Sequence, residues 1–128
     1  MDYTDLLNKP YLRNGRGPDN YDCWGLVMEV YRRMGIELFD INRPVFSKRE
    51  IILMMKEHEP LTGFKESSNE PKEPGVFYDR RRGHIGIMIG KKHVLHAVEP
   101  QGVVVFPIDS FLMLNPNARY YEHCQCTT

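Results

Sequence analysis

Hydrophobic positions recur at intervals of three and four residues from position 26 to position 34, which is the period of an amphipathic helix. The apolar positions are Leu26, Val27, Val30, Tyr31 and Met34. Asp22 is a natural N-cap, which puts Cys23 at the first helical position, and Gly35 follows as a stop signal. The pattern therefore predicts a helix that begins at Cys23, in which Gly25 keeps the space in front of the thiol free of a side chain.

The second half of the chain alternates with the period of two that is typical of strands. Strands are predicted at 76–79, 84–89 and 93–98, separated by a charged break at 80–83 and a turn at 90–93. In the middle strand, His84, Gly86 and Met88 share one face, while three isoleucines form the other, which is a core face. His96 shares a face of the next strand with two valines, so an antiparallel pair can set His84 and His96 side by side.

Further elements complete the predicted secondary structure. Ser47-Lys48-Arg49-Glu50 has the pattern of a capping box, which opens a second helix from Arg49 to about His58. The remainder is a loop over 61–74, a strand over 103–107, a turn or short helix over 109–112 and a last strand over 119–123. Helices in the N-terminal half and an antiparallel sheet in the C-terminal half predict an α+β fold, with the site where the Cys23 helix meets the sheet.

Cys23 is the first candidate for chemistry, because a thiolate is a strong nucleophile toward a carbonyl carbon. A free thiol has a pKa of about 8.5 and is mostly protonated near neutrality. The N-terminus of a helix and an adjacent histidine both lower that pKa. The sequence supplies the helix at Cys23 and two histidines, His84 and His96, on neighbouring strands.

Three motifs carry a resemblance to a known family. They are Asp22-Cys23-x-Gly25-Leu26, then Gly83-His84-Ile85-Gly86-Ile87-x-Ile89-Gly90, then Leu95-His96-Ala97. In this order they resemble the NlpC/P60 family of cell-wall cysteine peptidases, and the resemblance covers nearly the whole chain. It implies a papain-like fold and a hydrolase that needs no metal or organic cofactor.

The resemblance also implies roles for particular residues. Cys23 is the nucleophile, His84 the general base and His96 the third residue, which orients the base. Tyr11 corresponds to a tyrosine that the family often places near the oxyanion site. Asp22 and Trp24, on either side of the cysteine, are expected to contribute to oxyanion or substrate binding.

The substrate implied by the family is the peptidoglycan stem peptide, cut between D-glutamate and a diamino acid. Trp24 replaces a serine that many wall-directed members carry, and wall-binding repeats do not accompany the motifs. The form Tyr21-Asp22-Cys23-Trp24-Gly25 in a short chain resembles members associated with phage and prophage tails. Phage tail proteins are therefore expected partners beside the peptidoglycan peptide.

The 128 residues, of which 41% are hydrophobic, suffice for one core, so a single catalytic domain over 1–128 is expected. A net charge of zero disfavours nucleic-acid binding. A signal peptide and an apolar run of about 18 residues are both missing, so no membrane insertion is expected. Cytoplasmic synthesis and action at the bacterial wall or in a phage particle follow as expectations.

The three cysteines are not spaced as a disulfide framework. Cys124 and Cys126 lie in a polar tail with His123, where a frayed terminus is favoured over a zinc site. Arg80, Arg81 and Arg82 form either a solvated hairpin tip or a site for substrate carboxylates.

Each candidate also has a structural interpretation. Cys23 could be a small buried hydrophobic residue, His84 a surface residue at a hairpin end, and His96 a core histidine bonded to a carbonyl. A phage tail assembly component with vestigial or single-use hydrolase activity is the alternative function. An acyltransferase or amidase acting on lipids is disfavoured, because the cysteine precedes the histidine and no apolar anchor is present.

Overall fold

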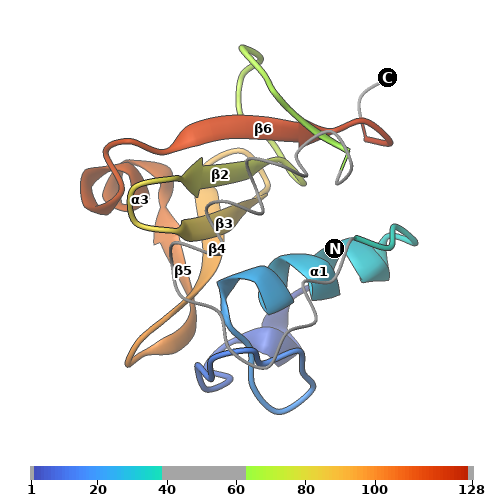
Figure 1. Cartoon of the computed structure of the whole chain (residues 1–128), viewed down its shortest axis with the longest axis vertical. Helices are drawn as coiled ribbons and strands as arrows, with labels where there is room; N and C mark the ends of the chain where they lie inside the picture. Colours follow the sequence, from blue (N-terminus) through green and yellow to red (C-terminus); the bar gives the residue numbers. More distant parts are fainter. Residues whose placement is uncertain (1, 39–62, 127–128) are drawn as a thin grey trace.

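The computed structural model describes residues 2–38 and 63–126 (Figure 1). The helix predicted from Arg49 to about His58 lies outside the described residues. The elements in chain order are η1 (Thr4–Leu6), α1 (Cys23–Arg33), β1 (Phe64–Glu66), β2 (Val76–Asp79), β3 (His84–Ile89), β4 (His93–Val98), β5 (Gly102–Pro107), α3 (Ile108–Leu114) and β6 (Arg119–His123).

The strands form a six-stranded antiparallel sheet in the order β1-β6-β2-β3-β4-β5. The strands predicted from the period of two are all present, and the predicted turn or short helix after β5 is the helix α3. Strand β1 was not predicted, because its three residues are too few to carry a period. A helix packed on an antiparallel sheet confirms the predicted α+β class.

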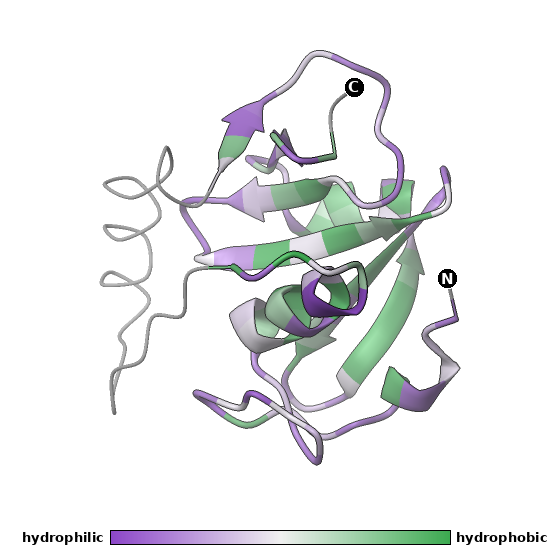
Figure 2. Ribbon diagram, turned by 90° about the vertical axis from the view of Figure 1, so that its right-hand side faces the viewer, coloured by the Kyte–Doolittle hydropathy of each residue, from purple (hydrophilic) through white to green (hydrophobic). Residues whose placement is uncertain are grey.

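One face of the sheet is covered by α1, which packs on β3 and β4. Figure 2 shows the apolar residues concentrated in the strands and on the helix beside them, and the polar residues in the loops. Val27, Val30 and Tyr31 of α1 are at most 1% exposed and pack against Ile87 and Leu95. The helix predicted from the 26–34 pattern is therefore confirmed, and its apolar face forms the main core.

The opposite face of the sheet is buried as well, which the sequence pattern did not predict. Met88 and Val94 are fully buried there in a second cluster with Phe111 of α3. Gly86 makes this packing possible, because a Cβ at Gly86 would lie 2.9 Å from the Phe111 ring. The face that carries His84 and His96 is thus also a core face, closed by α3.

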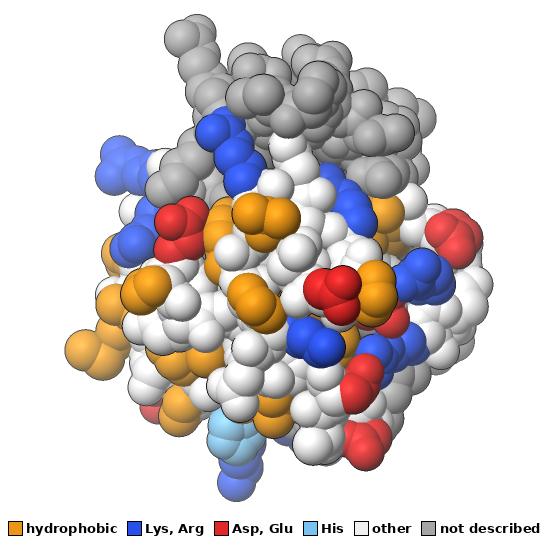
Figure 3. Space-filling model, turned by 90° about the horizontal axis from the view of Figure 1, so that it is seen from below, with side chains coloured by type: hydrophobic (Ala, Val, Ile, Leu, Met, Phe, Trp, Pro, Cys, Tyr) orange, Lys and Arg blue, Asp and Glu red, His pale blue; other side chains and the backbone are white. Residues whose placement is uncertain are grey.

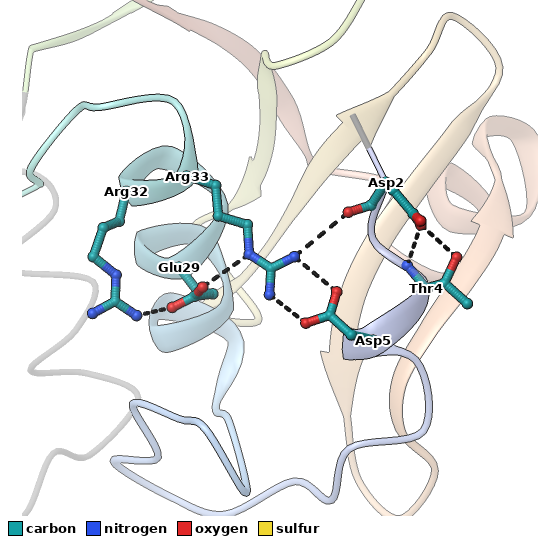
Figure 4. Close-up of polar contacts among 6 residues, drawn as sticks. All are labelled: Asp2, Thr4, Asp5, Glu29, Arg32 and Arg33. Carbon is teal, nitrogen blue, oxygen red and sulfur yellow. Dashed lines mark hydrogen bonds and ion pairs between the residues drawn. The ribbon is translucent and has the colours of Figure 1, made fainter.

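Charged side chains fix the N-terminal segment to the end of α1 (Figure 4). The Arg33 guanidinium donates to both carboxylate oxygens of Asp5, at 2.8 and 2.6 Å, and its Nε donates to Glu29 at 2.9 Å. Arg32 pairs with the other oxygen of Glu29. Arginines in the last turn also interact favourably with the negative end of the helix dipole.

The chain after η1 runs along the outer edge of β5. The Asn8 N–H donates to the Val103 carbonyl and the Val103 N–H donates to the Lys9 carbonyl, both at 2.9 Å. Gly102 permits this approach, because a Cβ there would lie 2.3 Å from the Lys9 oxygen. The pairing delivers the segment that begins at Tyr11 to the end of α1 that carries Cys23.

The surface carries charges of both signs. On the face seen in Figure 3, the basic and acidic side chains of the described residues lie interspersed, with apolar side chains between them. This distribution agrees with a formal net charge of zero.

Candidate active site

Cys23 is held at the start of α1 by the carboxylate of Asp22. Oδ1 of Asp22 accepts the Gly25 N–H at 2.7 Å and the Arg16 guanidinium at 2.9 Å, and Oδ2 accepts the Asn14 N–H at 3.0 Å. The predicted N-cap is therefore confirmed, and it also binds the preceding loop to the helix. Asp22 positions the cysteine through these bonds, which occupy both of its oxygens.

Gly25 has a different role from the one predicted. A Cβ at Gly25 would lie 2.0 Å from the carbonyl oxygen of Gly15, so the residue faces the loop before the helix and not the space in front of the thiol. That prediction was wrong, because the path of the loop has no periodic signal in the sequence. Gly25 allows the loop to pack directly on the first turn of α1.

The turn between β2 and β3 is held by Asp79, which is fully buried. Its Oδ1 accepts the N–H groups of Arg81 and Arg82, and its backbone carbonyl accepts the Gly83 N–H at 2.8 Å. These bonds present the Gly83 carbonyl to the Cys23 thiol, with 3.9 Å between Sγ and the oxygen. Arg82 is exposed at this turn, and its guanidinium donates to the Leu114 carbonyl at 2.5 Å.

The Cys23 side chain is 7% exposed. Burial, and next the carboxylate of Asp22, raise the pKa of the thiol to about 11, while the backbone amides of Ile85 and Trp24 act in the opposite direction. The sequence predicted that the helix N-terminus would lower this pKa, but burial dominates. A reactive thiolate at neutral pH therefore requires a base that takes the proton from sulfur.

His84 and His96 meet on the face covered by α3. Nε2 of His84 lies 2.9 Å from Nδ1 of His96, as the period of two predicted. The His96 ring is 1% exposed and lies between Phe106 and Phe111, with ring centroids at 4.5 and 5.1 Å. The contact occupies Nε2, one of the two ring nitrogens of His84.

Burial lowers the pKa of His96 to about 4, so this ring is neutral near pH 7. An unfolded histidine has a pKa of about 6.5 and binds more protons than the folded one between these values. The burial of His96 should therefore cost about 3 kcal/mol of stability as the pH falls from about 6.5 to 4. Urea unfolding at several pH values should show a weaker acid dependence for His96→Gln than for the wild type.

The exposed His93 provides the control for this measurement. His93→Gln should keep the acid dependence of the wild type. Equal pH dependence of the wild type and His96→Gln would contradict the neutral, buried state of His96.

A pocket of about 790 Å³ joins these residues. Cys23, Gly83, His84 and His96 line it, and it is closed by residues from three further segments. These are Tyr11 and Arg13 from the loop before α1, Glu99 and Gln101 from the turn between β4 and β5, and Leu114 and Asn115 from the end of α3. Residues from six parts of the chain thus converge on one concave site.

The other residues predicted for the site differ in their placement. Tyr11 lines the pocket, and burial together with the nearby Cys23 and Asp22 raises the pKa of its phenol. Asp22 reaches the same pocket. Trp24 is 3% exposed, belongs to the main core and does not line the pocket. Its indole packs in that core at the first turn of α1.

Sequence reasoning missed Arg13, Glu99 and Asn115. All three lie in loops or at an element end, where no period links them to Cys23 or His84. The turn-forming sequence Asn115-Pro116-Asn117 marked a turn but gave no sign that it ends in the pocket.

Comparison of the chain with models of known protein families shows to which family it belongs. The model of the NlpC/P60 family matches residues 8–121. The chain belongs to the NlpC/P60 family. Members of this family are cell-wall peptidases and amidases, and the matched range contains every pocket residue named above. No match was found among curated proteins.

Membrane-spanning helices are not found in residues 2–38 and 63–126, where each helix is too short or too polar to cross a bilayer.

The three cysteines are all free thiols; Cys124 is exposed and Cys126 half-buried.

Proposed function

We propose that the chain is a cysteine endopeptidase that hydrolyses amide bonds in peptidoglycan stem peptides, with Cys23 as nucleophile, His84 as general base and His96 as the residue that orients the base. The observation that carries this proposal is the 2.9 Å contact between the two histidine rings in the pocket that holds the Cys23 thiol. Membership of a family of cell-wall peptidases and amidases supports the substrate class.

The reaction begins when Nδ1 of His84 takes the thiol proton as sulfur attacks the amide carbonyl. Proton transfer overcomes the raised pKa of the buried thiol, since the resulting imidazolium stabilises the thiolate beside it. His96 is neutral and accepts the Nε2–H of His84, which fixes the orientation of the base. The oxyanion is stabilised by the Cys23 N–H at the helix start and by the Tyr11 hydroxyl.

The tetrahedral intermediate collapses when the C–N bond breaks and His84 returns its proton to the leaving amine. The acyl group is then a thioester on Cys23. Water attacks the thioester with His84 again as base, which releases the carboxylate and regenerates the thiol.

Charges at the rim of the pocket support cleavage of the D-glutamyl–diamino acid bond. Arg13 and Arg82 contribute guanidinium groups and Glu99 contributes a carboxylate. A stem peptide carries both carboxylates and the free amino group of its diamino acid, and such a mixed rim can bind both kinds of charge.

A phage or prophage particle is the context that we propose for this activity. The support is the resemblance of the segment Tyr21–Gly25 to tail-associated members. Tyr21 and Trp24 are 2% and 3% exposed, so this form of the motif is part of the core that holds Cys23. A tail assembly component with a vestigial site is the competing function, and it would not require two histidines in contact beside a buried thiol.

Digestion of purified peptidoglycan sacculi tests the proposal. The wild type should release stem-peptide fragments with new amino termini, identified by mass spectrometry, and Cys23→Ala should lose on the order of 10⁴-fold or more of this rate. Cys124→Ala is the matched control, because that thiol is exposed and outside the pocket. The proposal would be contradicted if the wild type digested neither sacculi nor isolated stem peptides, or if Cys23→Ala retained the activity.

A further inference from the structure

His96 has one ring nitrogen that the proposed mechanism does not use. Its Nδ1 lies 2.9 Å from Nε2 of His84, and since this Nδ1 accepts in the proposed mechanism, the neutral His96 ring carries its proton on Nε2. This Nε2–H is buried and has no hydrogen-bond partner among the described residues. A buried donor of this kind normally has a partner.

Asn115 presents the complementary acceptor. It follows α3 and is 3% exposed, and both its backbone N–H and its side-chain Nδ2 donate to the Phe111 carbonyl, at 2.9 and 3.0 Å. Since a carbonyl can only accept, these bonds fix which end of the amide faces Phe111. The other end, Oδ1, is buried and without a partner in residues 2–38 and 63–126.

Phe111 connects the two groups. Its carbonyl binds Asn115, and its ring packs on the His96 ring at 5.1 Å between centroids. Asn115 and His96 both line the pocket of about 790 Å³. Each of these two residues thus keeps one buried polar atom without a partner in residues 2–38 and 63–126, a donor on His96 and an acceptor on Asn115, and both residues contact Phe111. One water molecule that bonds to both would satisfy them together.

We infer that Asn115 is a positioning residue, whose Oδ1 holds the Nε2–H of His96 through a bridging water molecule. The inference rests on the proposed function, since it extends the series Cys23–His84–His96 by one member. The hydrogen bond at one imidazole nitrogen determines which tautomer the ring adopts. Asn115 thereby keeps Nδ1 of His96 unprotonated, so that it can accept the Nε2–H of His84.

Two substitutions separate this role from a purely structural one. Asn115→Leu and Asn115→Asp both remove the Nδ2 donor to Phe111, but only Asn115→Asp keeps an oxygen at the position of Oδ1. We expect Asn115→Leu to lower kcat for stem-peptide hydrolysis by about 10-fold or more with KM little changed, the size of effect known for partners that orient metal-bound histidines. Asn115→Asp should recover most of the rate, with the acid limb of its pH profile moved upward because a carboxylate favours a protonated His96.

Asn117, which is exposed two residues further on, provides the control. Asn117→Leu should match the wild type in rate and pH profile. Equal losses in Asn115→Leu and Asn115→Asp would overturn the inference, because they would trace to the lost bond with Phe111.

The tautomer can also be measured without turnover. The ¹⁵N chemical shifts of the His96 ring should show the proton on Nε2 in the wild type and a mixture of tautomers in Asn115→Leu, and unchanged shifts would overturn the inference. A failure of the proposed function would give another result. His84→Ala, made in the otherwise wild-type protein, would then leave the rate of Cys23 alkylation unchanged, independently of the results for the Asn115 variants.

Discussion

Replacing His84 by alanine should slow the alkylation of Cys23 by iodoacetamide at pH 7 on the order of 10²–10⁴-fold, the usual contribution of a positioned base. In the variant, burial and the Asp22 carboxylate still raise the pKa of the thiol and no base takes its proton, so alkylation should rise only in alkaline solution. In the wild type, Nδ1 of His84 accepts the proton and reaction should persist to well below neutral pH. The measurement is the rate of Cys23 modification between pH 5 and pH 11.

The other thiols must be separated from Cys23 in this experiment. Cys124 is exposed and accessible to the reagent, so modification should be followed by mass spectrometry of the Cys23 peptide. His93→Ala is the matched histidine control, because His93 is exposed at the start of β4. If the pH profiles of the wild type and His84→Ala coincide, His84 does not activate the thiol.

The sequence predicted well those features that a local period or a local bond creates. The start of α1 follows from Asp22, whose side chain caps a helix made of its next neighbours. The meeting of His84 and His96 follows from the period of two on adjacent antiparallel strands. Both predictions needed only contacts within one element or between neighbouring elements.

Features created by long-range packing were not predicted. Asn115 reaches the pocket only because α3 turns back over the sheet, with Phe111 filling the space beside Gly86. Trp24 was expected to contribute to oxyanion or substrate binding because it follows Cys23 in the sequence. Its indole is buried in the core, and adjacency in sequence does not show which way a side chain points. The pKa of Cys23 was expected to fall, because the helix start is visible in the sequence but the depth of burial is not.

The proposed proton transfer from Cys23 to His84 depends both on the local period of the strands and on long-range packing. The period of two brings His84 to His96, whereas burial sets the properties of the thiol and of the second ring: it raises the pKa of Cys23 and lowers that of His96. In the proposed mechanism, a thiol that holds its proton and a ring that stays neutral leave His84 as the group that changes its protonation. The proposed chemistry therefore depends on how closely α1 and α3 pack on the sheet.

Replacing Gly25 by alanine tests that packing directly, and the expected sign is opposite to that of an ordinary helix substitution. Alanine in place of glycine inside a helix normally stabilises by about 1 kcal/mol. Here the added Cβ would lie 2.0 Å from the Gly15 carbonyl oxygen, a backbone atom that cannot move by a change of rotamer. We expect Gly25→Ala to lower the free energy of unfolding by about 2 kcal/mol or more, measured by urea denaturation.

The same substitution should disturb the site, because the displaced loop contains three partners of Asp22: Asn14, Gly15 and Arg16. The Asp22 N–H donates to the Gly15 carbonyl and Oδ2 accepts the Asn14 N–H, so moving Gly15 loosens the cap that holds Cys23. Alkylation of Cys23 should consequently lose part of its dependence on His84. Gly35→Ala is the comparison: its Cβ would have no atom within 4 Å, so only the strain of φ +83° remains, and Cys23 should react as in the wild type. A Gly25→Ala protein more stable than the wild type would mean that the loop does not pack on α1 as described.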